Sequence, residues 1–238
     1  MILRRVIKHF REQEWTAIAL DFLIVVIGVF VGLQVSNWNE ARLERKAEAA
    51  FLERLSVDIQ EELSAVGSSL ENALSSRDNL SQAIFIIQSD DADAMLTEEQ
   101  CLAAWQSHFV AAYSFSGLLS VDALLKSRGL EIVSNPEIQM SLINYQREMA
   151  RSANKANWIS RDAKNLVDEF PQVFPRRLQP GDSFGRVDCQ LNAMRELPAV
   201  RNKLISNHGR MGGIVDRLEA QMELLRELQL MIGERTRK

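Results

Sequence analysis

The 238-residue sequence predicts an all-α protein, in which a single N-terminal transmembrane helix is followed by an elongated up-and-down helical bundle. Three observations favour this fold class. Residues 16–35 form an apolar stretch with one charge, apolar residues then recur at steps of three and four, and strand-like alternation is nearly absent. The composition agrees, because 46% of the residues are hydrophobic and only 11 are glycine and 5 proline, which excludes fibrous and disordered classes.

The apolar stretch is long enough to cross a bilayer. No polar residue occurs from Phe22 to Leu33, and about 20 apolar residues span the hydrocarbon region. Trp15 and Trp38 bracket the stretch, and an unbroken helix would separate them by roughly 35 Å, which matches the aromatic belts of a membrane. No small-residue cleavage site follows closely. We therefore predict an uncleaved transmembrane anchor over residues 15–38, with these two tryptophans as interface anchors.

Residues 1–14 have a pattern of their own. Apolar residues recur at helical spacing, and basic residues fill the other side. This favours a basic amphipathic segment lying in the membrane interface against anionic lipid. The alternative is a plain positive flank that only orients the anchor, and the sequence leaves both interpretations open.

The layout of the chain predicts its orientation. Lysine and arginine are equally frequent just before and just after the apolar stretch, so the positive-inside rule does not decide. A short basic tail followed by a large domain is typical of a signal anchor with its N-terminus in the cytoplasm. We therefore expect a bacterial inner-membrane protein whose residues 39–238 form an extracytoplasmic, periplasmic helical-bundle domain.

The residues at both ends of the apolar stretch carry a resemblance to a known family. Asp21 precedes the run Val25-Val26-Ile27-Gly28, and Asn37-Trp38-Asn39-Glu40 follows it. This arrangement resembles the N-terminal signature of a family of bacterial single-pass membrane proteins with a domain of unknown function. Members more often carry glutamate where this chain has Asp21. The resemblance implies a topology and no activity.

The remainder of the chain is predicted to form four main helices. After Trp38 the helical period continues to about Gln88 without a proline, which predicts one long helix. Local signals predict the ends of the later helices. These are a capping box from Thr97 to Gln100 that opens a helix to about Tyr113, Ser120 as the cap of a helix that stops at Gly129, Pro136 at the start of a helix to Pro171, a linker over 171–188, and a final helical segment over 189–232 with a break at Pro198.

The sequence contains no constellation that indicates catalysis. Nucleophile elbows, phosphate-binding loops and zinc-protease motifs are absent. Three histidines and two cysteines are too few and too scattered for a metal cluster. A net charge of −4, with no basic run among aromatic residues, does not suggest nucleic-acid binding. We therefore predict no catalytic, cofactor-binding or metal-binding residues.

Two further features concern pairing. Cys101 and Cys189 open two different predicted helices and could form a disulfide, or they could be two buried thiols. Within the apolar stretch, Asp21, Gly28, Gly32 and Asn39 fall on one face of a helix, and the two glycines form a G-x-x-x-G motif that favours close helix association. The alternative is a lone anchor that tolerates one acidic residue.

These observations predict a membrane-anchored, non-enzymatic interaction protein. Its expected partners are the lipid bilayer and a protein bound through the transmembrane helix and the bundle surface, so that it acts as an accessory or scaffold subunit; a second copy of the chain is another candidate partner. The alternative is a periplasmic sensory or ligand-binding bundle that signals through a partner, because helical bundles bind small molecules between their helices.

Overall fold

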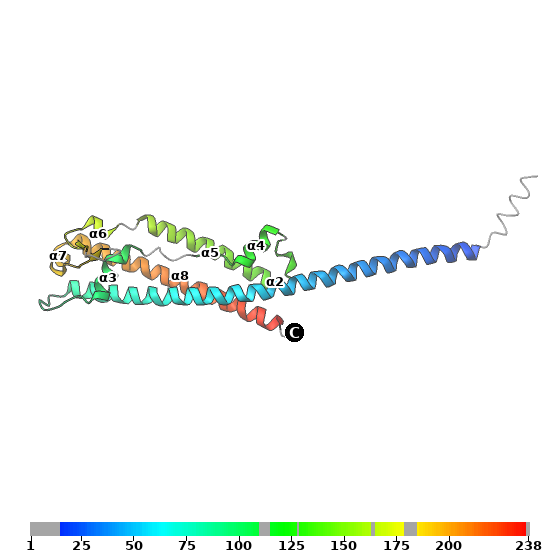
Figure 1. Ribbon diagram of the computed structural model, residues 1–238, viewed down its shortest axis with the longest axis horizontal. Coiled ribbons are helices and arrows are strands. Elements are labelled where there is room, and N and C mark those ends of the chain that lie inside the picture. The colour runs from blue at the N-terminus through cyan, green and yellow to red at the C-terminus, as the bar shows by residue number, and fades with distance from the viewer. Residues whose placement is uncertain (1–14, 110–114, 128, 163–164, 179–184, 237–238) are drawn as a thin grey trace, which may run out of the picture. The chain divides into compact units, whose positions relative to one another are not determined.

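The computed structural model describes residues 15–109, 115–127, 129–162, 165–178 and 185–236, and these residues form an all-α fold (Figure 1). The chain divides into two compact units, Met1–Ala50 and Phe51–Lys238. The predicted segment 1–14 lies outside the described residues. The α-helices are α2 (Trp15–Gln88), α3 (Glu98–Gln106), α4 (Leu119–Ser127), α5 (Pro136–Asp162), α6 (Leu166–Glu169), α7 (Leu191–Glu196) and α8 (Pro198–Thr236), joined by short 3₁₀ turns at Ser107–Phe109 and Leu130–Ile132.

The second unit is organised around three long helical segments that bury a seven-residue repeat. On α2 every seventh residue from Leu52 to Ile87 is buried, and α5 and α8 alternate steps of three and four. This is the spacing that lets side chains of neighbouring helices interlock as in coiled coils. The buried residues of the repeat are Leu52, Ile59, Val66, Ala73, Leu80 and Ile87 on α2, Ile138, Leu142, Tyr145, Met149, Ser152, Ala156 and Ile159 on α5, and Val200, Leu204, Asn207, Met211, Ile214, Leu218, Gln221, Leu225, Leu228 and Ile232 on α8.

The contacts between α5 and α8 define an antiparallel pair. Ser141 contacts Met231, Tyr145 contacts Gln221, and Ser152 contacts Arg217. The residue numbers thus rise along α5 while those of the contacting residues fall along α8. Figure 1 shows α8 running against α5 and against the part of α2 that belongs to this unit. Helices α2 and α5 therefore run in the same direction, and the chain must return along the bundle between them.

The return connection differs from the helix predicted to begin after Thr97. The helix that begins after Thr97 was expected to reach Tyr113, but α3 ends at Gln106 and a 3₁₀ turn follows over Ser107–Phe109; the rest of the expected helix lies outside the described residues. In that turn Ser107 is buried and its hydroxyl accepts a hydrogen bond from the Asn207 amide at 3.0 Å. The long-range partner on α8 thus holds a tighter turn where local periodicity favoured α-helix.

Most helix ends follow the local signals. The capping box is present, with the Gln100 N–H donating to Thr97 Oγ1 and the Thr97 N–H donating to Gln100 Oε1. Pro136 and Pro198 are the first residues of α5 and α8. Gly129 has a φ of 76°, a conformation that side chains disfavour. The continuous helix through Gln88 is also as predicted.

Three boundaries were wrong. Helix α4 begins at Leu119, so Ser120 lies inside it, and its N–H donates to Asp58 Oδ2 of α2 at 2.7 Å. The helix expected to reach Pro171 ends at Asp162, and a new helix begins after Asn165, whose side chain accepts from the Val167 N–H. The linker contains two paired antiparallel strands, β1 (Arg176–Arg177) and β2 (Arg186–Val187).

Candidate functional site

The N-terminal part of α2 exposes the apolar surface that the sequence predicts for a membrane anchor. The helix from Leu20 to Gln88 contains a window with a mean hydropathy of 1.9, and none of that window is buried. By length and composition this helix could span a membrane. Trp15 is the first residue of α2, and Trp38 is exposed with the Arg42 guanidinium carbon 5.8 Å from its ring centroid. Such an aromatic and basic pair suits a membrane interface.

The predicted association stripe lies along this exposed surface. Asp21, Gly28, Gly32 and Asn39 are all exposed on α2, and helix geometry places them on one face. A methyl group added at either glycine would meet no atom within 4 Å. Both glycines therefore leave room on this face for the close approach of another helix.

In the second unit a disulfide joins segments far apart in the sequence. Cys101 of α3 and Cys189, just before α7, are bonded, with their Cα atoms 5.7 Å apart. An ion pair of 3.1 Å between Arg186 and Glu98 lies nearby. A groove of about 900 Å³ runs beside the disulfide, and Met95 and Trp105 contribute to its lining. The disulfide therefore ties α3 to the segment between β2 and α7.

A buried polar layer crosses the three long helices. The Gln221 amide of α8 donates to Glu62 Oε1 of α2 at 2.9 Å and to the Tyr145 hydroxyl of α5 at 3.1 Å. Burial raises the pKa of Glu62, and the hydrogen bond from Gln221 partly opposes this. Burial likewise raises the pKa of Tyr145, so its hydroxyl stays protonated. Polar residues at buried heptad positions select one register of helix packing.

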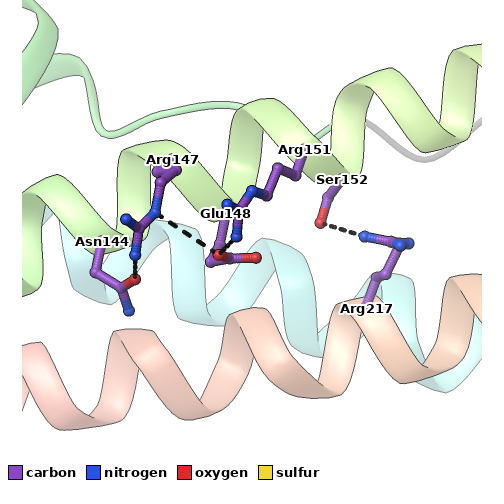
Figure 2. Close-up of polar contacts among 6 residues, drawn as sticks. All are labelled: Asn144, Arg147, Glu148, Arg151, Ser152 and Arg217. Carbon is purple, nitrogen blue, oxygen red and sulfur yellow. Dashed lines mark hydrogen bonds and ion pairs between the residues drawn. The ribbon is translucent and has the colours of Figure 1, made fainter.

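A separate pocket lies between α5 and α8. Its volume is about 290 Å³. Both apolar and charged side chains line it, and the lining residues are Glu148, Met149, Ser152, Lys155, Ile159, Gly213, Asp216, Arg217, Ala220 and Leu224. Figure 2 shows Ser152 of α5 and Arg217 of α8 pointing toward each other, and the arginine donates to the serine hydroxyl at 3.2 Å.

Some charged side chains around this pocket form ion pairs and others do not. Glu148 forms ion pairs with Arg151 and, at 3.9 Å, with Arg147 (Figure 2). Arg217 and Lys155 form no ion pair within the described part of the chain. The Lys155 ammonium instead lies 4.4 Å from the centroid of the Trp158 ring. Two cations on facing helices are thus left without a charged partner.

Neither this pocket nor the polar layer was predicted from the sequence. Ser152 and Gln221 occupy positions of the seven-residue repeat that are otherwise apolar. A polar residue in such a repeat was the available signal for both. The position of Arg217 beside the pocket depends on how α8 is rotated against α5, which has no local signal.

Comparison with protein families, with curated proteins and with solved structures finds no match to this chain. The family suggested by the N-terminal residues therefore stays a prediction. Among the described residues, no group of three or more histidine, cysteine or acidic side chains could hold a metal ion.

Proposed function

We propose that this protein is a single-pass membrane protein of the bacterial inner membrane, and that it acts as a non-enzymatic accessory or scaffold subunit. One observation carries the proposal: α2 holds an exposed apolar segment and, further along, the first heptad helix of the bundle. Exposed apolar surface of this extent is unfavourable in water and favourable in lipid. The anchor therefore keeps the bundle at a membrane surface.

The stripe of Asp21, Gly28, Gly32 and Asn39 supports an interaction within the membrane. Lipid tails are as apolar as leucine, so helices associate there through close packing and interhelical hydrogen bonds. Two glycines one turn apart, with open space above both, permit such packing. An acidic residue inside the membrane is costly unless it is paired, and a neighbouring helix is one source of a pair.

Two measurements test this function on the full chain. A reporter that is active only in the periplasm, fused after Lys238, should be active; a signal only from a cytoplasm-active reporter would overturn the orientation. The protein extracted in a mild non-ionic detergent should elute as a complex with another membrane protein or with a second copy. Elution as a lone monomer would overturn the subunit role.

A second candidate is a ligand-binding bundle that signals through a partner. The observation that favours it is the mixed polar and apolar pocket between α5 and α8. In this role the bundle would pass its signal to an associated protein.

A further inference from the structure

We propose that the pocket between α5 and α8 binds a small organic carboxylate with an apolar body, held by Arg217, Lys155 and Ser152. This inference names the ligand class of the ligand-binding candidate and rests on that candidate. It can fail separately from the membrane-anchored subunit role. Absence of carboxylate binding would leave the elution behaviour of the protein, which tests that role, unchanged.

The charge around the pocket favours an anion. Arg217 is half-buried and its contact among the described residues is a neutral hydroxyl, so most of its five N–H donors remain available. Arginine binds carboxylates through two parallel hydrogen bonds. Lys155 adds a second cation from the facing helix; it is exposed, and its ammonium would have to leave the Trp158 ring to reach a ligand. Partial burial of the Arg217 guanidinium without an anionic partner is costly, and a bound carboxylate would offset that cost.

Ser152 provides the neutral contact. Its residue is 5% exposed, and its oxygen accepts from Arg217, which leaves the hydroxyl proton able to donate to a ligand. The serine thus fixes the guanidinium and completes a set of three donors from two helices. Ser152 and Arg217 already hold each other, so they lose little conformational entropy on binding.

Two carboxylates line the same pocket and must be accounted for. Glu148 is already neutralised by Arg151 and Arg147. Asp216 is exposed, and it forms no ion pair in the part of the chain described by the structure. It should therefore weaken the binding of an anion by repulsion, and strengthen the binding of an amine.

The remaining lining defines the body of the ligand. Met149, Ile159, Ala220 and Leu224 supply apolar walls. A volume of about 290 Å³ is at the small end of ligand pockets, which span roughly 300 to 1,000 Å³. The walls favour a ring or short chain over a bare inorganic anion.

The test is calorimetric titration of the full-length protein in a non-ionic detergent. The probes are benzoate, its uncharged analogue benzyl alcohol, and inorganic phosphate. Benzoate should bind, and each of the other two should bind at least about tenfold more weakly, since a hydrogen bond to a charged group is worth that factor or more. Absence of benzoate binding, equal binding of benzyl alcohol or equal binding of phosphate would overturn the proposal.

Variants on α8 identify the site. Arg217→Gln should weaken benzoate binding about tenfold, whereas Arg226→Gln, an exposed arginine on the opposite face of α8, should leave it unchanged. Asp216→Asn should strengthen binding a few-fold. Weaker benzoate binding in Asp216→Asn, or equal effects of the two arginine variants, would contradict the assignment.

A pair of glycines gives a steric control that removes no charge. Gly213 lines the pocket and Gly212 does not, and both have open space where a side chain would begin. Gly213→Leu should abolish benzoate binding by filling the pocket, while Gly212→Leu should retain it. Unfolding curves for each variant separate a filled pocket from a destabilised bundle. Full binding by a folded Gly213→Leu variant would overturn the proposal.

Discussion

The two parts of α2 show opposite relations between hydrophobicity and burial. From Leu20 to Val35 nearly every residue is apolar, yet the side chains are exposed. From Leu52 to Ile87 apolar residues are sparser, yet every seventh position of the chain holds an apolar residue that is buried. A helix that is apolar on all sides cannot be covered by neighbours on one side, whereas a periodic stripe can. A periodic apolar stripe therefore predicts that a helix packs against other helices of the protein. An apolar surface on all sides of an exposed helix instead predicts contact with lipid.

The largest expected effect comes from a covalent bond that only the bundle has. The double variant Cys101→Ser, Cys189→Ser should lower the free energy of unfolding of the bundle by about 4 kcal/mol, because the bond closes a loop across 88 positions of the chain. Urea unfolding of the full chain, followed by tryptophan fluorescence, measures this. An unchanged midpoint, or complete thiol labelling of the unreduced native protein, would contradict the prediction.

A matched pair of isoleucines tests the comparison directly. Ile59→Ala removes a side chain that is 0% exposed and should cost about 2 to 5 kcal/mol of bundle stability, because it leaves a cavity. Ile27→Ala, in the apolar segment, removes one that is 52% exposed and should leave the unfolding of the bundle unchanged. The same urea titration reports both. Equal effects of the two variants would show that the two parts of α2 do not differ in packing.

The glycine stripe gives a smaller effect, which lies in the apolar segment that we propose crosses the membrane. Gly28→Ile or Gly32→Ile should push neighbouring helices apart and lose contacts worth roughly 0.6 to 2 kcal/mol, enough to reduce association several-fold. Association of the full protein in detergent is the measurement. Val29→Ile, on another face of the helix, is the control and should change nothing. Glycine variants that behave like this control would make the segment an anchor only.

The smallest effect concerns the charge in the polar layer. Burial raises the pKa of Glu62 in the folded bundle, so its ionisation is easier in the unfolded chain. Stability from this group is therefore fully present below the ordinary pKa of 4.5 and is lost as pH rises through the raised value. Glu62→Gln should be more stable than the wild type at pH 7. The difference should shrink toward zero below pH 4.5.

Urea midpoints of both proteins between pH 4 and pH 8 check this sign. A variant that is less stable than the wild type at pH 7 would mean that the hydrogen bond from Gln221 outweighs the cost of burying the carboxylate. Glu61→Gln provides the control, since Glu61 is exposed on the same helix.

Features with a local cause were predictable. The continuous helix to Gln88 follows from unbroken periodicity, and the boundary at Thr97 follows from reciprocal hydrogen bonds within four residues. Pro136 and Pro198 begin helices because proline lacks the N–H that an interior position needs. The seven-residue repeat of α5 and α8 is also present in the sequence, but only helices were predicted there, and neither the repeat nor its polar members Ser152 and Gln221 were interpreted.

The sequence by itself therefore determined which segments are helical, where most of them begin, and which segment is apolar enough for a membrane. Only the tertiary structure decided that Asp58 caps α4, that Cys101 reaches Cys189, and that Arg217 meets Ser152 across a pocket. The physical reason is range. Helix formation and capping depend on residues within about one turn of each other, whereas these three contacts depend on the direction and rotation of helices that lie far apart in the chain.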